Sequence, residues 1–126
     1  MRRLVFTCTV AIFYSFSAVA QSSIDVRVAS SANDAEERVS GGSIKLGSSD
    51  LEMVFDRSRQ QIVGIRFSPV DVPRGALITN AYIQFTADET TTESTVLSIR
   101  AQNADYAPVF GSGRRDLSVR PLKVGS

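Results

Sequence analysis

Residues 80–88 read NAYIQFTAD and alternate apolar with more polar side chains over most of their length. Ala81, Ile83, Phe85 and Ala87 fall on one side of such a segment, and the intervening residues fall on the other. Alternation with a period of two is typical of a β-strand that has one buried face. The stretch therefore predicts a strand whose apolar side packs into a core.

Five further segments repeat this alternation more briefly. They are IDVRV (24–28), SIKLG (43–47), LEMVFD (51–56), QQIVGIRFS (60–68) and TVLSIRAQ (95–102). The connections between them are rich in Gly, Ser, Asn, Asp and Pro, which favour turns. Strands with one polar face, and without helices to cover a parallel sheet, predict antiparallel sheets. We expect an all-β fold, an antiparallel β-sandwich of jelly-roll-like form.

The length of the chain allows one such domain. A jelly roll has about eight strands, and the pattern supplies six, so the module is either minimal or incomplete. We place the β-sandwich module at residues 21–112. Residues 113–126 are expected to be an irregular tail or the start of a truncated strand region.

The first 20 residues have the features of a secretory signal peptide. Two arginines precede a 13-residue apolar run, and small residues follow it as SAVA, with cleavage expected after Ala20. The run is shorter than the roughly 20 residues that cross a bilayer, so no membrane span is expected. The sequence therefore predicts a secreted, extracellular protein.

Composition excludes several kinds of chemistry. The chain has no histidine, and its one cysteine, Cys8, lies in the predicted signal peptide. Ser-His-Asp and Cys-His catalysis and an ordinary zinc site are therefore excluded. Loss of Arg2 and Arg3 takes the Lys and Arg total from 14 to 12 against 13 Asp and Glu, a nearly neutral balance. Without a basic stripe, nucleic acid is not an expected partner.

The stretch VGIRFSPVDVPRGALITNAYIQFTADE (63–89) is the most specific part of a family resemblance. Across roughly residues 26–122 the sequence resembles extracellular jelly-roll modules, similar to the DNRLRE-type and carbohydrate-binding-module-like repeats of secreted marine bacterial and invertebrate proteins. The DNRLRE string and the tryptophan-bearing strand of that pattern are absent. The resemblance implies a non-catalytic accessory or adhesive role and does not supply a ligand.

A cluster of oxygen-bearing side chains offers a candidate calcium site. NDAEE supplies Asn33, Asp34, Glu36 and Glu37 next to an expected strand end, and Asp88 ends another strand. Calcium binds six to eight oxygens and accepts irregular loops. The spacing is not that of an EF-hand, and the alternative is a solvated loop that keeps the sheet end soluble. We favour the solvated loop.

A sparse sugar-binding platform is the second candidate site. Tyr82 and Gln84 share the outward face of segment 80–88, and Arg66 is predicted outward on segment 60–68, where Val63 and Ile65 point inward. An aromatic ring can stack on a sugar while polar groups orient it. The alternative is that Tyr82 is an ordinary surface residue of a strand.

Three classes of function are consistent with these features. The first is a secreted non-catalytic module for binding or adhesion, with polysaccharide or extracellular matrix as partner and calcium as a structural ion. The second is a structural matrix protein, including a biomineral component of shell or skeleton. The third, an enzyme with paired carboxylates, ranks last because no motif selects a pair among the acids. We therefore expect no enzymatic activity.

Overall fold

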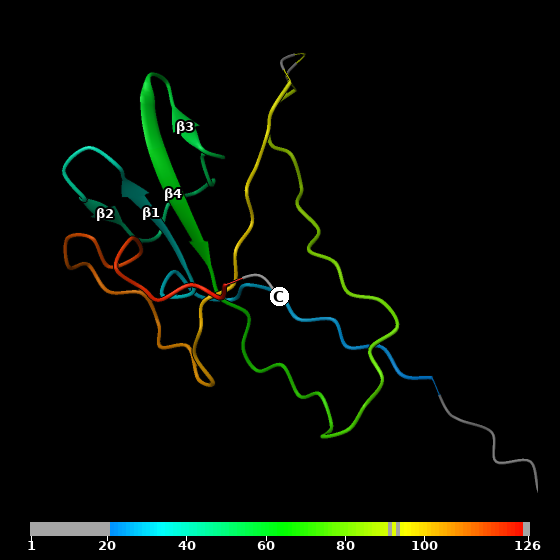
Figure 1. Cartoon of the computed structure of the whole chain (residues 1–126). Helices are drawn as coiled ribbons and strands as arrows, with labels where there is room; N and C mark the ends of the chain where they lie inside the picture. The colour runs from blue at the N-terminus through cyan, green and yellow to red at the C-terminus, as the bar shows by residue number, and fades with distance from the viewer. Residues whose placement is uncertain (1–20, 91, 93, 125–126) are drawn as a thin grey trace, which may run out of the picture.

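The computed structural model describes residues 21–90, 92 and 94–124 of the chain. These residues contain no helix and form one antiparallel sheet with the strand order β2-β1-β4-β3 (Figure 1), which confirms the all-β class. The strands are β1 (Asp34–Arg38), β2 (Ile44–Lys45), β3 (Phe55–Asp56) and β4 (Arg59–Ile65). The predicted signal peptide lies outside the described residues. None of the described residues belongs to a helix that is long and apolar enough to span a bilayer.

Two tight turns build the sheet from neighbouring segments of sequence. Gly41 and Gly42 connect β1 to β2 with φ angles of 92° and 70°, a left-handed conformation that a side chain disfavours. The Gly42 N–H donates to the Arg38 carbonyl at 2.9 Å and closes this turn. The turn from β3 to β4 likewise holds Arg57 at a φ of 56°. Each short edge strand is therefore positioned by the longer strand that it pairs with.

The core lies on one face of the central strand pair. Ala35 of β1 pairs with Gly64 of β4, and the buried side chains Phe110 and Leu117 pack against them from the C-terminal part of the chain. A Cβ atom at position 64 would lie 2.6 Å from Leu117 Cδ2 and 2.9 Å from Phe110 Cζ. Glycine at this position therefore allows the two apolar side chains to approach the backbone of the sheet.

The prediction that Gly64 points outward and Val63 and Ile65 point into the core is wrong. In the register of β1 and β4, Val63 lies opposite Glu36 on the face that the core cluster does not use. Alternation in the sequence separates two faces but does not identify which one is covered. Here residues 101–124, which we call the C-terminal segment, cover the face of Gly64, while Val63 and Ile65 are half-buried on the other face.

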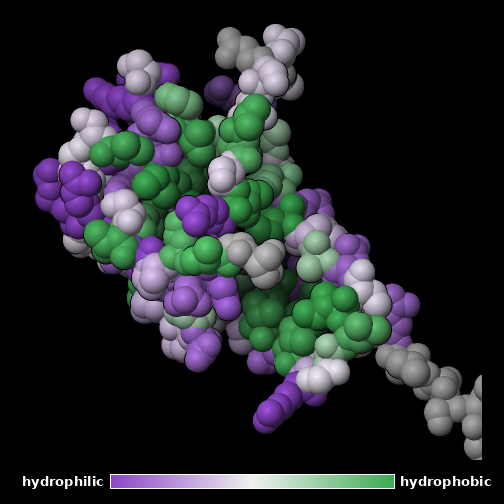
Figure 2. All heavy atoms as spheres, viewed as in Figure 1, coloured by the Kyte–Doolittle hydropathy of each residue, from purple (hydrophilic) through white to green (hydrophobic). Residues whose placement is uncertain are grey.

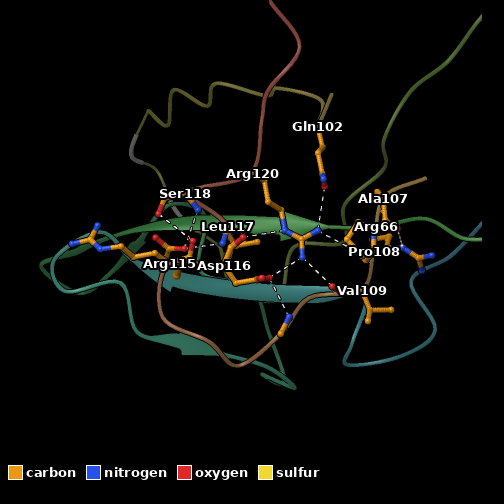
Figure 3. Close-up of polar contacts among 12 residues, drawn as sticks. Arg66, Gln102, Ala107, Pro108, Val109, Arg115, Asp116, Leu117, Ser118 and Arg120 are labelled. Carbon is orange, nitrogen blue, oxygen red and sulfur yellow. Dashed lines mark hydrogen bonds and ion pairs between the residues drawn. The ribbon is translucent and has the colours of Figure 1, made fainter. Parts of the chain in front are cut away.

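Arg120 holds the C-terminal segment together (Figure 3). Its guanidinium lies 4.6 Å from the centre of the Phe110 ring and forms a 2.8 Å ion pair with Asp116. It also donates hydrogen bonds to Gln102 Oε1 and to the carbonyls of Pro108, Val109 and Asp116. Residues 113–124 thus form turns and one isolated bridge rather than a strand, and they still supply Leu117 to the core.

Three of the six predicted strands are confirmed, and three are not. The segments SIKLG, LEMVFD and QQIVGIRFS contain β2, β3 and β4. Segments 24–28, 80–88 and 95–102 carry no strand. A strand needs a continuous hydrogen-bonded neighbour as well as the right side-chain pattern. The last segment has only an isolated bridge from Gln102 to Leu122, beside the hydrogen bond that the Lys123 N–H donates to the Ala101 carbonyl. The second sheet of the predicted sandwich stays a prediction.

Residues 77–100, which we call the extended arm, leave the sheet after β4 and return to it before the C-terminal segment (Figure 1). Every described residue of the arm is exposed. None of them forms a main-chain hydrogen bond with another described residue. Leu77 is 87% exposed and Val96 is 88% exposed. The arm therefore carries apolar side chains in water and adds nothing to the core.

We expect Gly64→Ala to destabilise the fold by about 1–3 kcal/mol, because the new methyl group would overlap Leu117 and Phe110. Gly113→Ala is the matched control, since no atom lies within 4 Å of a Cβ built there. Its effect should stay within about 0.5 kcal/mol. Urea unfolding of both variants measures the difference, and equal stabilities would contradict the packing described here.

Candidate functional site

A polar groove lies on the face of the sheet opposite the core. Glu36 is 2% exposed, and its Oε1 accepts a 2.8 Å hydrogen bond from the Glu52 N–H. Lys45 Nζ lies 3.8 Å from Glu36 Oε2. The groove has a volume of about 330 Å³. Its lining consists of Glu36, Arg38, Ser43, Ile44, Lys45, Glu52, Asp56, Arg57 and Gln61.

The groove combines both signs of charge. Burial raises the pKa of Glu52, and the nearby carboxylates of Asp50, Asp56, Glu36 and Glu89 raise it further, in that order. Arginine, lysine and glutamine side chains in the same lining supply hydrogen-bond donors. An arrangement with donors and acceptors side by side suits an uncharged polar ligand with several hydroxyl groups.

Glu37 points to the other face and has a structural role. It is 1% exposed, and its Oε2 accepts hydrogen bonds from the N–H groups of Leu117 at 2.9 Å and Ser118 at 3.0 Å. Figure 3 shows Leu117 and Ser118 beside Asp116 and Arg120. A buried carboxylate needs such partners because water no longer solvates it. Glu37 therefore attaches the C-terminal segment to the central strand.

The favoured expectation that NDAEE (33–37) is a solvated loop is wrong. Residues 34–38 are strand β1, so Glu36 and Glu37 point to opposite faces of the sheet. Asn33 Oδ1 accepts a hydrogen bond from Arg66, and Asp88 is exposed on the extended arm. The structure does not bring the five predicted ligands together. Among the described residues, no group of three acidic side chains is placed to hold a metal ion.

The glycine pair after β1 is a sequence signal that predicts this strand. Gly41 and Gly42 separate EERV from SIKL, and a glycine pair between two such segments is typical of a hairpin turn. This turn predicts a strand before it as well as after it. The buried roles of Glu36 and Glu37 have no comparable signal, because their partners are 16 and 80 residues away in the chain.

The three predicted sugar-binding residues separate into two groups. Tyr82 is 78% exposed and Gln84 is also exposed, both on the extended arm. Arg66 is half-buried, and its Nε donates to the Ala107 carbonyl at 2.8 Å while Nη1 donates to Asn33 Oδ1 at 2.7 Å (Figure 3 shows the first contact). The Arg66 guanidinium is thus engaged in joining distant segments. Tyr82 and Gln84 remain as candidate contacts.

The exposed apolar side chains of the molecule are concentrated outside the sheet. Figure 2 shows apolar residues in green on the lower right of the molecule, where the chain runs away from the sheet. Those of the arm include Leu77, Ile78, Tyr82, Ile83, Phe85, Val96, Leu97 and Ile99. A second hollow, of about 590 Å³, lies between the residues before and within β3 and the tip of the arm. The arm therefore carries eight of the large apolar side chains that are exposed among the described residues.

Comparison with protein-family models, with curated proteins and with solved structures found no match to this chain.

We expect Glu37→Gln to lower the free energy of unfolding by about 1–3 kcal/mol, because a neutral amide accepts the two N–H bonds more weakly than a carboxylate. Glu89→Gln makes the same substitution of an amide for a carboxylate at an exposed position of the arm. It should change the free energy of unfolding by no more than about 0.5 kcal/mol. Chemical denaturation near neutral pH compares the two. An unchanged stability of the Glu37 variant would contradict its role in attaching the C-terminal segment.

A pH dependence follows from Asp116. Burial acts to raise its pKa, but the Gly111 N–H and the Arg120 guanidinium outweigh burial and lower the pKa below 3.8. A lowered pKa stabilises the fold above pH 3.8, and this contribution is lost as the pH falls through the folded-state value. Asp116→Asn should therefore be less stable than the wild type at neutral pH. The difference should shrink well below pH 3.8, and denaturation at both pH values tests it.

Proposed function

We propose that this chain is a secreted, non-catalytic module for extracellular binding or adhesion, and that its partner is a polysaccharide or another matrix component. The observation that supports this most strongly is the exposure of the whole described part of the extended arm. Secretion rests on the signal-peptide features of residues 1–20. The second candidate, a structural matrix protein, would use the same exposed arm.

The many exposed apolar side chains of the arm favour a role in binding a partner. Contiguous apolar surface is rare on soluble monomers and commonly marks an interaction site. Its removal from water by a partner contributes about 25 cal/mol per Å². The arm offers this surface along its length, whereas the described sheet offers mainly a polar groove.

The arm lacks the fixed geometry that a catalytic site requires. A catalytic group must be held in a fixed geometry by packing and hydrogen bonds. The arm residues lack main-chain hydrogen bonds to other described residues. Binding requires only that suitable side chains reach the partner, so the arm is better suited to adhesion than to a reaction.

Tyr82 and Gln84 give the surface a preference for sugars. Positions two apart point to the same side of an extended segment. The phenol ring of Tyr82 can stack on the apolar face of a pyranose, and the Gln84 amide can both donate to and accept from its hydroxyl groups. The polar groove beside β2 supplies further donors and acceptors for a hydroxyl-rich chain.

We expect Tyr82→Ala to weaken polysaccharide binding by about tenfold, the loss typical of an exposed aromatic contact. Tyr106→Ala is the matched control, because Tyr106 is 82% exposed and Tyr82 is 78% exposed, but Tyr106 lies outside the arm. Glycan arrays and sedimentation with insoluble polysaccharides measure the binding, and extracellular matrix proteins are tested in parallel. The absence of binding to both classes, or an equal loss in both variants, would contradict the proposal.

A further inference from the structure

We infer that residues 80–88 of the extended arm pair with the same residues of a second copy of the chain, as antiparallel strands related by a two-fold axis at Gln84. This inference is independent of the polysaccharide partner proposed above. It assigns a homotypic contact to the segment with the clearest strand pattern in the sequence, which the structure leaves without a neighbouring strand.

The backbone of this segment is available for pairing. Residues 80–88 are all exposed, and they form no main-chain hydrogen bonds with other described residues. An extended segment with free N–H and C=O groups is a template for the addition of another strand. Such pairing would satisfy the groups on one edge of the segment and set Ile83 and Phe85, now 43% and 47% exposed, beside apolar side chains of the second copy.

The side chains of the segment are complementary to themselves. With the two-fold axis at Gln84, Ile83 lies opposite Phe85, and Ala81 lies opposite Ala87. A β-branched residue opposite an aromatic residue is a favourable cross-strand pair. All four residues lie on one face, so the paired strands keep a continuous apolar side. The same operation relates both copies, as in most homodimers.

Charge favours the antiparallel arrangement over the parallel one. Asp88 and Glu89 are the only charged residues between Leu77 and Thr90. In the proposed register Asp88 lies opposite Asn80, so no like charges are directly opposed. A parallel in-register pair would instead place both acids of one copy against the same acids of the other, which is unfavourable.

The competing partner is the returning part of the arm. Pairing of residues 80–88 with residues 95–101 of the same chain could place Ile83 opposite Ile99 and Phe85 opposite Leu97. The structure contains no main-chain hydrogen bonds between these two segments, and Ile99 is 69% exposed. Segment 80–88 is therefore free to pair with a second copy.

Cysteine cross-linking tests the register. In the full chain with Cys8→Ser, Gln84→Cys places a thiol on the two-fold axis, where facing Cα atoms lie about 4.5–5.5 Å apart, within the range of a disulfide. Thr86→Cys is the matched control. In this register, position 86 faces Tyr82 of the second copy, and the two new thiols lie about 14 Å apart along the strands, beyond the reach of a disulfide.

We expect a several-fold larger fraction of disulfide-linked dimer for Gln84→Cys than for Thr86→Cys, after equilibration in a glutathione redox buffer. Non-reducing gels measure this fraction, and sedimentation of the Cys8→Ser parent should show a dimer. Both substitutions lie outside the sheet and its core, so both variants should keep the circular dichroism of the parent. A monomeric parent, or equal cross-linking at both positions, would overturn the inference.

Discussion

The described fold depends on the attachment of the C-terminal segment to the central strand through Glu37. A sheet with two strands of only two residues each is marginal by itself. Its buried core is small and takes two of its three side chains, Phe110 and Leu117, from the distant segment. The hydrogen bonds that Leu117 and Ser118 donate to the Glu37 carboxylate place those side chains on the sheet. The Phe110 N–H, which donates to the Ala32 carbonyl, and the Arg115 N–H, which donates to the Gly42 carbonyl, add two main-chain attachments, to residues on either side of β1.

Adjacent carboxylates in β1 have different roles because the strand turns them to opposite faces. Glu37 organises the core side, and Glu36 lies in the polar groove between Lys45 and the Glu52 N–H. The ordered part of the chain thus has one face that is closed by its own C-terminal segment and one that is accessible. The extended arm lies outside both faces, and all of its described residues are exposed.

The sequence predicts the β class well and the contacts between distant segments poorly. Short-range alternation and turn chemistry locate β2, β3 and β4, because β2 and β3 each pair with a strand a few residues away. The pairing of β4 with β1 joins more distant segments, and the local pattern does not show it. The sequence places the acids of β1 in solvent, because no neighbouring residue indicates that the Leu117 N–H donates a hydrogen bond to Glu37. Residues 80–88 have the side-chain alternation of a strand but form no sheet hydrogen bonds, because no neighbouring strand lies beside them among the described residues. Tyr82 is exposed, as is every other residue of 80–88. Arg66 forms hydrogen bonds with Asn33 and Ala107, which are 33 and 41 residues away in the chain.

The sequence separation of 80 residues between Glu37 and Leu117 has a consequence for biosynthesis. The four strands leave the ribosome well before the segment that covers them. During that interval the Glu37 carboxylate stays hydrated, and closure of the long intervening loop carries an entropic cost that grows slowly with its length. Nascent chains therefore expose Ala35 and the backbone at Gly64 until translation has passed Leu117. Protection from premature association at this stage falls to chaperones rather than to the fold.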